Sequence, residues 1–88
     1  MREFDFDVIV QWDGTAGDDF LDRCEATLKD AFQGDVTPAV KAGVPLVSCT
    51  LRGGSPEEAM LPVFKVLRDL HLSVRYVQFY PGVVGPAA

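Results

Sequence analysis

The first strand-like segment of the chain limits the fold to a sheet with one covered face. Apolar side chains occupy every second position of residues 4–12, and Asp5 and Asp7 stand between them. The apolar set is Phe4, Phe6, Val8, Val10 and Trp12. Because successive side chains of a strand point to opposite faces, one face must be buried while the other meets water. Ile9 is the exception, since it places an apolar side chain on the polar face.

A helical repeat follows the turn residues 13–17 and predicts a first helix over about residues 18–33. Its acidic start complements the positive end of the helix dipole, and Gly34 suits the left-handed position past the last turn. The apolar stripe of this helix is Phe20, Leu21, Cys24, Leu28, Ala31 and Phe32.

Residues 55–58, Ser-Pro-Glu-Glu, have the features of a helix start. The serine hydroxyl caps the helix, the proline fits its first position, and Glu58 reaches back as in a capping box. The apolar repeat that follows predicts a second helix to about Leu70. Pro62 lies inside it and removes the bond to the Glu58 carbonyl, so we expect a kink or a restart there.

Two strands are expected between the helices, over residues 35–40 and 44–52. Pro38 has no N–H for a ladder hydrogen bond, so the first of them must lie at a sheet edge. The second alternates apolar and polar side chains as a central strand does.

The last expected strand, residues 73–80, is rich in β-branched and aromatic residues. Its apolar positions change parity between Val74 and Tyr76 on one side and Val77 and Phe79 on the other. A β-bulge, or burial of both faces, would explain the change.

Two strand-helix-strand units joined by a short hairpin leave few topologies. The favoured one is an α+β two-layer sandwich, with a four-stranded antiparallel sheet in the order 4-1-3-2 and both helices on one face. This β-α-β-β-α-β layout resembles the ferredoxin-like class of small domains. We take residues 1–82 as one such domain and residues 83–88 as an apolar C-terminal tail. The resemblance implies no particular activity, because fold does not fix function.

The charge of the chain argues against two classes of partner. Eight Lys and Arg stand against thirteen Asp and Glu, and the resulting net charge of −5 repels phosphate backbones and anionic lipid head groups. No apolar run approaches the roughly 20 residues that a membrane span needs. We therefore expect a cytoplasmic protein that binds neither nucleic acid nor membrane.

No residue pattern indicates a catalytic centre, a cofactor or a metal site. Cys24 and Cys49 are too few and too far apart for a zinc framework, so we expect free, buried thiols. His71, the only histidine, falls at the end of the second helix, where it tolerates left-handed backbone and complements the dipole.

Asp5 and Asp7 share one strand face. Two carboxylates at this spacing can hold a hard cation or act as acid and base. Cross-strand pairing with Arg52 or Arg75 is the simpler interpretation.

The uncovered face of the sheet is the expected contact surface. The first hypothesis is a non-enzymatic binding or regulatory module that self-associates, as a homodimer or small homo-oligomer, through this face or an edge, or that takes up a protein partner. The candidate contacts are Ile9, Leu46, Tyr76, Phe79 and Tyr80. The alternative is a small dimeric α/β-barrel-type enzyme, or a small-molecule-binding domain, with a pocket between sheet and helices. The candidate pocket residues are Asp7, Trp12, His71 and Tyr76.

Overall fold

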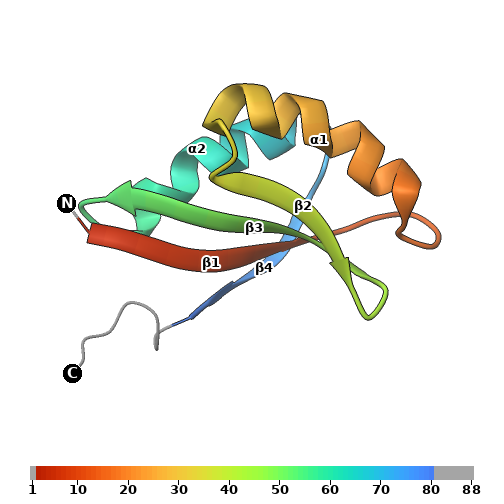
Figure 1. Ribbon diagram of the computed structural model, residues 1–88. Helices are drawn as coiled ribbons and strands as arrows, with labels where there is room; N and C mark the ends of the chain where they lie inside the picture. Colours follow the sequence, from red (N-terminus) through yellow and green to blue (C-terminus); the bar gives the residue numbers. More distant parts are fainter. Residues whose placement is uncertain (1, 81–88) are drawn as a thin grey trace.

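The computed structural model describes residues 2–80, which fold as a sheet with two helices (Figure 1). The elements in chain order are β1 (Arg2–Val10), α1 (Asp18–Phe32), β2 (Val36–Lys41), β3 (Val44–Gly53), α2 (Pro56–Asp69) and β4 (Val74–Phe79). The predicted tail, residues 83–88, lies outside the described residues. Among the helices of the described part, none is long and apolar enough to span a bilayer.

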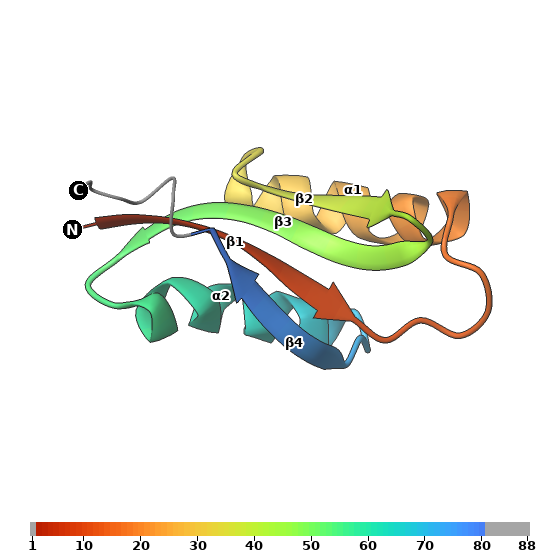
Figure 2. The same ribbon diagram turned by 90° about the horizontal axis from the view of Figure 1, so that it is seen from below.

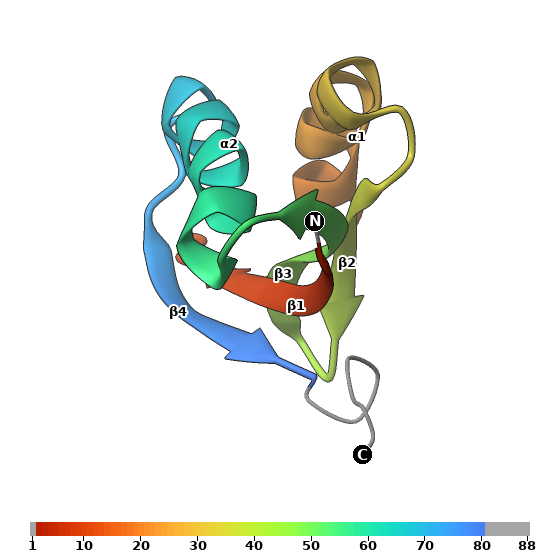
Figure 3. The ribbon, with the colours of Figure 1, turned by 90° about the vertical axis from the view of Figure 1, so that its left-hand side faces the viewer.

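The four strands form one sheet in the order β2-β3-β1-β4, and each neighbouring pair is antiparallel. This is the predicted order 4-1-3-2 read from the other edge, so the α+β class, the element order and the strand order are confirmed. Both helices lie on the same side of the sheet (Figure 3). Neither α1 nor α2 covers the opposite side, which is called the open face below (Figures 1 and 3).

The core lies between the sheet and the helices. Each helix contributes three fully buried side chains to it: Phe20, Cys24 and Leu28 from α1, and Ala59, Val63 and Leu67 from α2. The sheet contributes Phe4, Phe6, Val8, Val10, Val36, Val47 and Cys49. The alternation in β1 and the helical repeats therefore converge on one apolar layer, and both predicted cysteines are free and buried in it.

The start of α2 has the predicted serine cap, and Glu58 reaches back one residue beyond it. Ser55 Oγ accepts a hydrogen bond from the Glu58 N–H at 3.2 Å, and Glu58 Oε1 accepts one from the Gly54 N–H at 3.3 Å. A Cβ on Gly53 would stand 3.0 Å from the Ala59 backbone nitrogen, so only glycine lets the end of β3 approach this turn so closely. The helix runs through Pro62 without the expected restart. Pro62 and Glu58 are both exposed, so water can bond the Glu58 carbonyl that the proline leaves without an N–H.

β4 contains the register shift that its change of parity predicts. Ile9 lies opposite Tyr76, but Val10 lies opposite Val74, so Arg75 is the extra residue. As a result Val77 lies opposite core residue Val8, whereas Tyr76 lies on the open face with Ile9. The bulge explanation is confirmed.

β1 ends two residues earlier than the predicted boundary at Trp12. The chain leaves the sheet after the Gln11 N–H donates to the Ser73 carbonyl at 2.8 Å. The Trp12 ring then packs edge-on against Phe20, with ring centroids 5.2 Å apart. This contact with α1 explains why an apolar residue continues the alternation beyond the strand.

Candidate functional site

Side chains on the open face form rows that run across the sheet from strand to strand. One row is apolar and consists of Ala39, Leu46, Ile9 and Tyr76, which are consecutive cross-strand partners in β2, β3, β1 and β4. The next row is polar and consists of Thr37, Ser48, Asp7 and Gln78. These sets are called the apolar row and the polar row below.

The apolar row differs in exposure from its middle to its end. Ile9 and Leu46 are 3% and 4% exposed, so little of their surface is left for a partner to cover. Tyr76, at the β4 end, is 53% exposed. The accessible part of the row therefore lies at the β4 edge of the sheet rather than at its centre.

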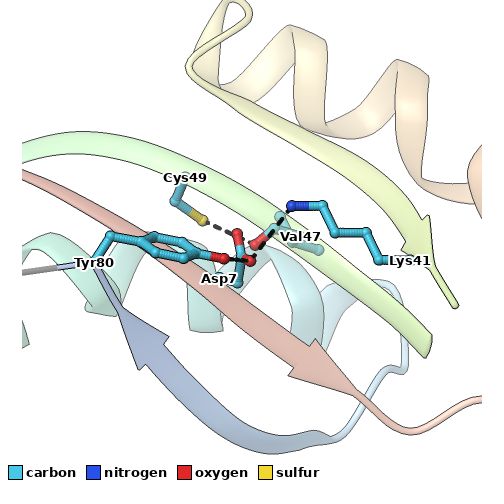
Figure 4. Close-up of polar contacts among 5 residues, drawn as sticks. All are labelled: Asp7, Lys41, Val47, Cys49 and Tyr80. Carbon is cyan, nitrogen blue, oxygen red and sulfur yellow. Dashed lines mark hydrogen bonds and ion pairs between the residues drawn. The ribbon is translucent and has the colours of Figure 1, made fainter. Parts of the chain in front are cut away.

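Asp7, in the polar row, is the one buried polar or charged side chain among the described residues. The Tyr80 hydroxyl donates a hydrogen bond to Asp7 Oδ2, and Lys41 Nζ lies 3.8 Å from the same oxygen (Figure 4). Asp7 Oδ1 is buried and has no hydrogen-bond partner among residues 2–80. Burying a carboxylate is costly, and the Tyr80 bond and the lysine charge offset part of that cost.

Three strands bring this cluster together. Asp7 lies in the central strand β1, Lys41 ends one edge strand, and Tyr80 directly follows the other. The arginine pairing expected from the sequence is absent from the polar contacts of the described residues. Arg52 lies opposite Glu3 instead.

Asp5 has a different environment, although it is two residues from Asp7 on the same face. Its Oδ1 accepts a hydrogen bond from Thr50 Oγ1 at 2.7 Å. The two carboxylates have no partner in common, and no group of three or more His, Cys, Asp or Glu within the described range could hold a metal ion.

The pKa shifts of the groups around Asp7 argue against an activated nucleophile or base at this site. The hydrogen bond to Asp7, with smaller effects of burial and of the Asp7 charge, raises the pKa of Tyr80. Burial, followed by the Asp7 charge, raises the pKa of Cys49 to about 12, and burial also raises the pKa of Cys24. A phenol or thiol that acts as a nucleophile or general base needs its pKa lowered toward neutral pH, so these groups are poorly suited to either role.

The five predicted contact residues divide between the two faces of the sheet. Ile9, Leu46, Tyr76 and Tyr80 lie on the open face, as the cross-strand rows and the Asp7 contact show. Phe79 lies opposite Phe6 and packs against its ring with centroids 5.1 Å apart, on the side of the helices.

Two of the four predicted pocket residues line a cavity of about 290 Å³ at the end of β1. Trp12 and His71 contribute to its wall, whereas Asp7 and Tyr76 lie on the open face. His71 has φ 61°, the left-handed backbone that its place after α2 suggested. The pocket prediction therefore joined residues from two separate regions.

Arg23 is one of five pocket residues that the sequence reasoning missed, together with Gln11, Asp13, Leu72 and Ser73. Its Nη2 donates to the Leu70 carbonyl at the end of α2 at 2.7 Å, and its guanidinium carbon lies 5.9 Å from the centroid of the Trp12 ring. The signal that would have found it is its position three residues after Phe20 on α1, because such spacing places two side chains on neighbouring parts of one helix face.

The chain matches no protein-family model, no curated protein and no solved structure. Its function is therefore argued from the geometry of the open face and of the Trp12 pocket.

Proposed function

We propose that this protein is a small cytoplasmic interaction module of the ferredoxin-like class, which self-associates through β4 and the adjoining part of the open face. The observation that carries the proposal is the accessible apolar surface on an edge strand. Val74 and Tyr76 are 37% and 53% exposed on β4, next to the unpaired outer side of that strand. Exposed edges of this kind bind other strands unless the protein blocks them.

The chemistry of the buried groups favours binding over catalysis. Tyr80 and both cysteines have raised pKa values, so they remain protonated at neutral pH. Protonated phenols and thiols are weak nucleophiles. Two free thiols also suit the reducing environment of the cytoplasm.

Sedimentation of matched variants tests the proposal. Tyr76→Lys places a charge in the accessible end of the apolar row and should shift the wild-type oligomer toward monomer. Leu61→Lys is the control, because Leu61 is similarly exposed, at 59%, but lies on α2 in the helix layer. The two variants have the same net charge, so a difference between them reports the location of the contact.

A wild-type protein that sediments as a monomer at high micromolar concentration would refute self-association. Equal weakening by both lysine variants would show that the contact is not specific to β4.

The Trp12 cavity supports a second candidate function, the binding of a small molecule. Its polar lining beside the indole ring consists of Gln11, Asp13, Arg23, His71 and Ser73, so polar groups of both kinds and an aromatic surface converge on a space of about 290 Å³. A small aromatic carboxylate fits the side of this space formed by Arg23 and Trp12, away from Asp13, because the guanidinium pairs with carboxylates and the indole stacks on rings.

Fluorescence of Trp12, the only tryptophan, tests this candidate. Titration with benzoate should change the emission to a saturable limit, and Arg23→Ala should abolish the change. A wild-type emission that stays constant or changes only linearly with benzoate would exclude this ligand class.

A further inference from the structure

The backbone hydrogen bonds of β4 determine which of its peptide groups face outward. The Tyr80 N–H donates to the Asp5 carbonyl at 3.1 Å, one step beyond the pair Phe6 and Phe79. In an antiparallel ladder, hydrogen-bonded and non-hydrogen-bonded pairs alternate. Tyr76 and Gln78 therefore bond to β1, and the N–H and C=O groups of Val77 and Phe79 point away from the sheet.

The two edges of the sheet differ in their capacity to accept another strand. β2 carries Pro38, which has no N–H to donate, and this strand packs beside α1 (Figures 1 and 3). β4 has no proline between Val74 and Phe79, and its outer side has no neighbouring strand in the described part of the chain (Figure 2). Only the β4 edge is prepared for strand addition.

We infer that the occupant of this edge is β4 of a second copy of the chain, paired antiparallel about a two-fold axis at Gln78. This inference rests on the proposed function and specifies its partner and register. The two copies would form one continuous eight-stranded sheet, with their open faces on the same side.

The Gln78-centred register satisfies the outward groups of both copies. Val77 of one copy lies opposite Phe79 of the other, so the two pairs exchange four backbone hydrogen bonds. On the open face, Tyr76 of each copy meets Tyr80 of the other, an aromatic pair that stabilises antiparallel strands. Gln78 meets itself on the axis, where an amide supplies both a donor and an acceptor.

Neighbouring registers lose these contacts. An axis at Val77 places Phe79 opposite Arg75, which is the extra residue of the bulge. An axis at Arg75 sets two like charges against each other.

The charge of the chain is compatible with a contact through β4. The chain carries a net charge of −5, so two copies repel each other in most orientations. Between Val74 and Phe79 the single charged residue is Arg75, a cation. The β4 edge therefore adds no acidic side chain to that repulsion.

Disulfide trapping tests the register. In Gln78→Cys the two thiols would lie in a non-hydrogen-bonded pair with Cα atoms about 4.5 Å apart, within the range that a disulfide spans. Thiols held together in a dimer have a millimolar effective concentration, so we expect mild oxidation to form the covalent dimer at least about tenfold faster than random collision allows.

The matched control is Thr37→Cys, because Thr37 is exposed and occupies the opposite end of the same polar row, on β2. It should cross-link only at the collision rate. Val77→Cys should also fail to cross-link with itself, since Val77 meets Phe79 in this register. The native cysteines are buried with raised pKa values and should not contribute.

The outcomes separate the two proposals. Fast cross-linking confined to Gln78→Cys supports the register. A wild-type dimer in which Gln78→Cys reacts no faster than Thr37→Cys, or in which Val77→Cys reacts fastest, overturns the register but leaves self-association standing. A monomeric wild type overturns both. Gln78→Glu gives an independent check. Two carboxylates on the axis should repel each other and dissociate the dimer at neutral pH, and their protonation in acid should restore it.

Discussion

The helix-covered face and the open face of the sheet bury side chains by different means. On the covered face, Phe6 and Val8 are at most 1% exposed and have only apolar neighbours in the core cluster. On the open face, Asp7 is buried almost as completely, at 2%, but its carboxylate has one hydrogen bond, one lysine nearby and one oxygen without a partner.

This contrast between the faces indicates which of them supplies most of the stability of the domain. Apolar burial is additive over many contacts, so the covered face should supply most of the folding free energy. A buried carboxylate stabilises little by itself, because desolvation opposes its attractions, but loss of a partner makes it costly. Mutations on the two faces should therefore differ in size and in their dependence on pH.

The largest effect is expected from Phe6→Ala on the covered face. Removing this ring leaves a cavity beside Phe79 and should lower the free energy of unfolding by about 3–5 kcal/mol. Tyr76→Ala, on the exposed end of the apolar row, should cost less than about 1 kcal/mol at a concentration where the protein is monomeric. Urea denaturation measures both, and equal losses would contradict the contrast between the faces.

An intermediate effect is expected from Tyr80→Phe. The ring remains, so water stays excluded, but Asp7 loses its hydrogen-bond donor, and we expect a loss of about 2 kcal/mol. Asp7→Asn should cost less, about 1 kcal/mol, because it removes the buried charge and keeps an acceptor for the Tyr80 hydroxyl. If Asp7→Asn proves the more damaging change in denaturant titrations, the carboxylate itself is the stabilising group.

The same hydrogen bond makes the stability depend on alkaline pH. The pKa of Tyr80 is raised above its ordinary value of 10.0 by the hydrogen bond to Asp7, so the folded state holds the phenol proton more tightly than the unfolded state does. The stability that this bond supplies is present below pH 10 and is lost as the pH rises through the raised folded pKa.

Wild type and Tyr80→Phe should therefore converge in stability above pH 10, as measured by thermal melting across the alkaline range. Tyr76→Phe is the control and should keep the wild-type decline. A constant gap between wild type and Tyr80→Phe would show that the Tyr80 hydroxyl does not act through its proton.

The fold could be predicted from the sequence wherever a local pattern had one physical solution. The alternation in residues 4–12 required a sheet with one covered face, and the cap formed by Ser55 and Glu58 determined where α2 begins. The parity change in β4 required a bulge, and the register shift opposite Ile9 and Val10 is that bulge. Each of these patterns depends on residues close together in the chain.

The candidate site could be predicted only in part, because its contacts join the ends of different strands. Tyr80 and Lys41 meet at Asp7 through the registers of both edge strands, and no local pattern encodes those registers. Assignment of Phe79 to one face required the position of the bulge. Trp12 continued the alternation of β1 but packs on Phe20 of α1, a tertiary contact that periodicity does not distinguish from a strand position.

The strand order affects how the chain can fold during its synthesis on the ribosome. β1 is the earliest element along the chain, yet its sheet partners are β3 and β4, and β4 comes last. The apolar residues of β1 therefore lack one or both neighbouring strands until nearly all of the domain has been translated. Such delayed pairing slows folding and invites aggregation, so nascent chains of this protein should depend on chaperones more than its small size suggests.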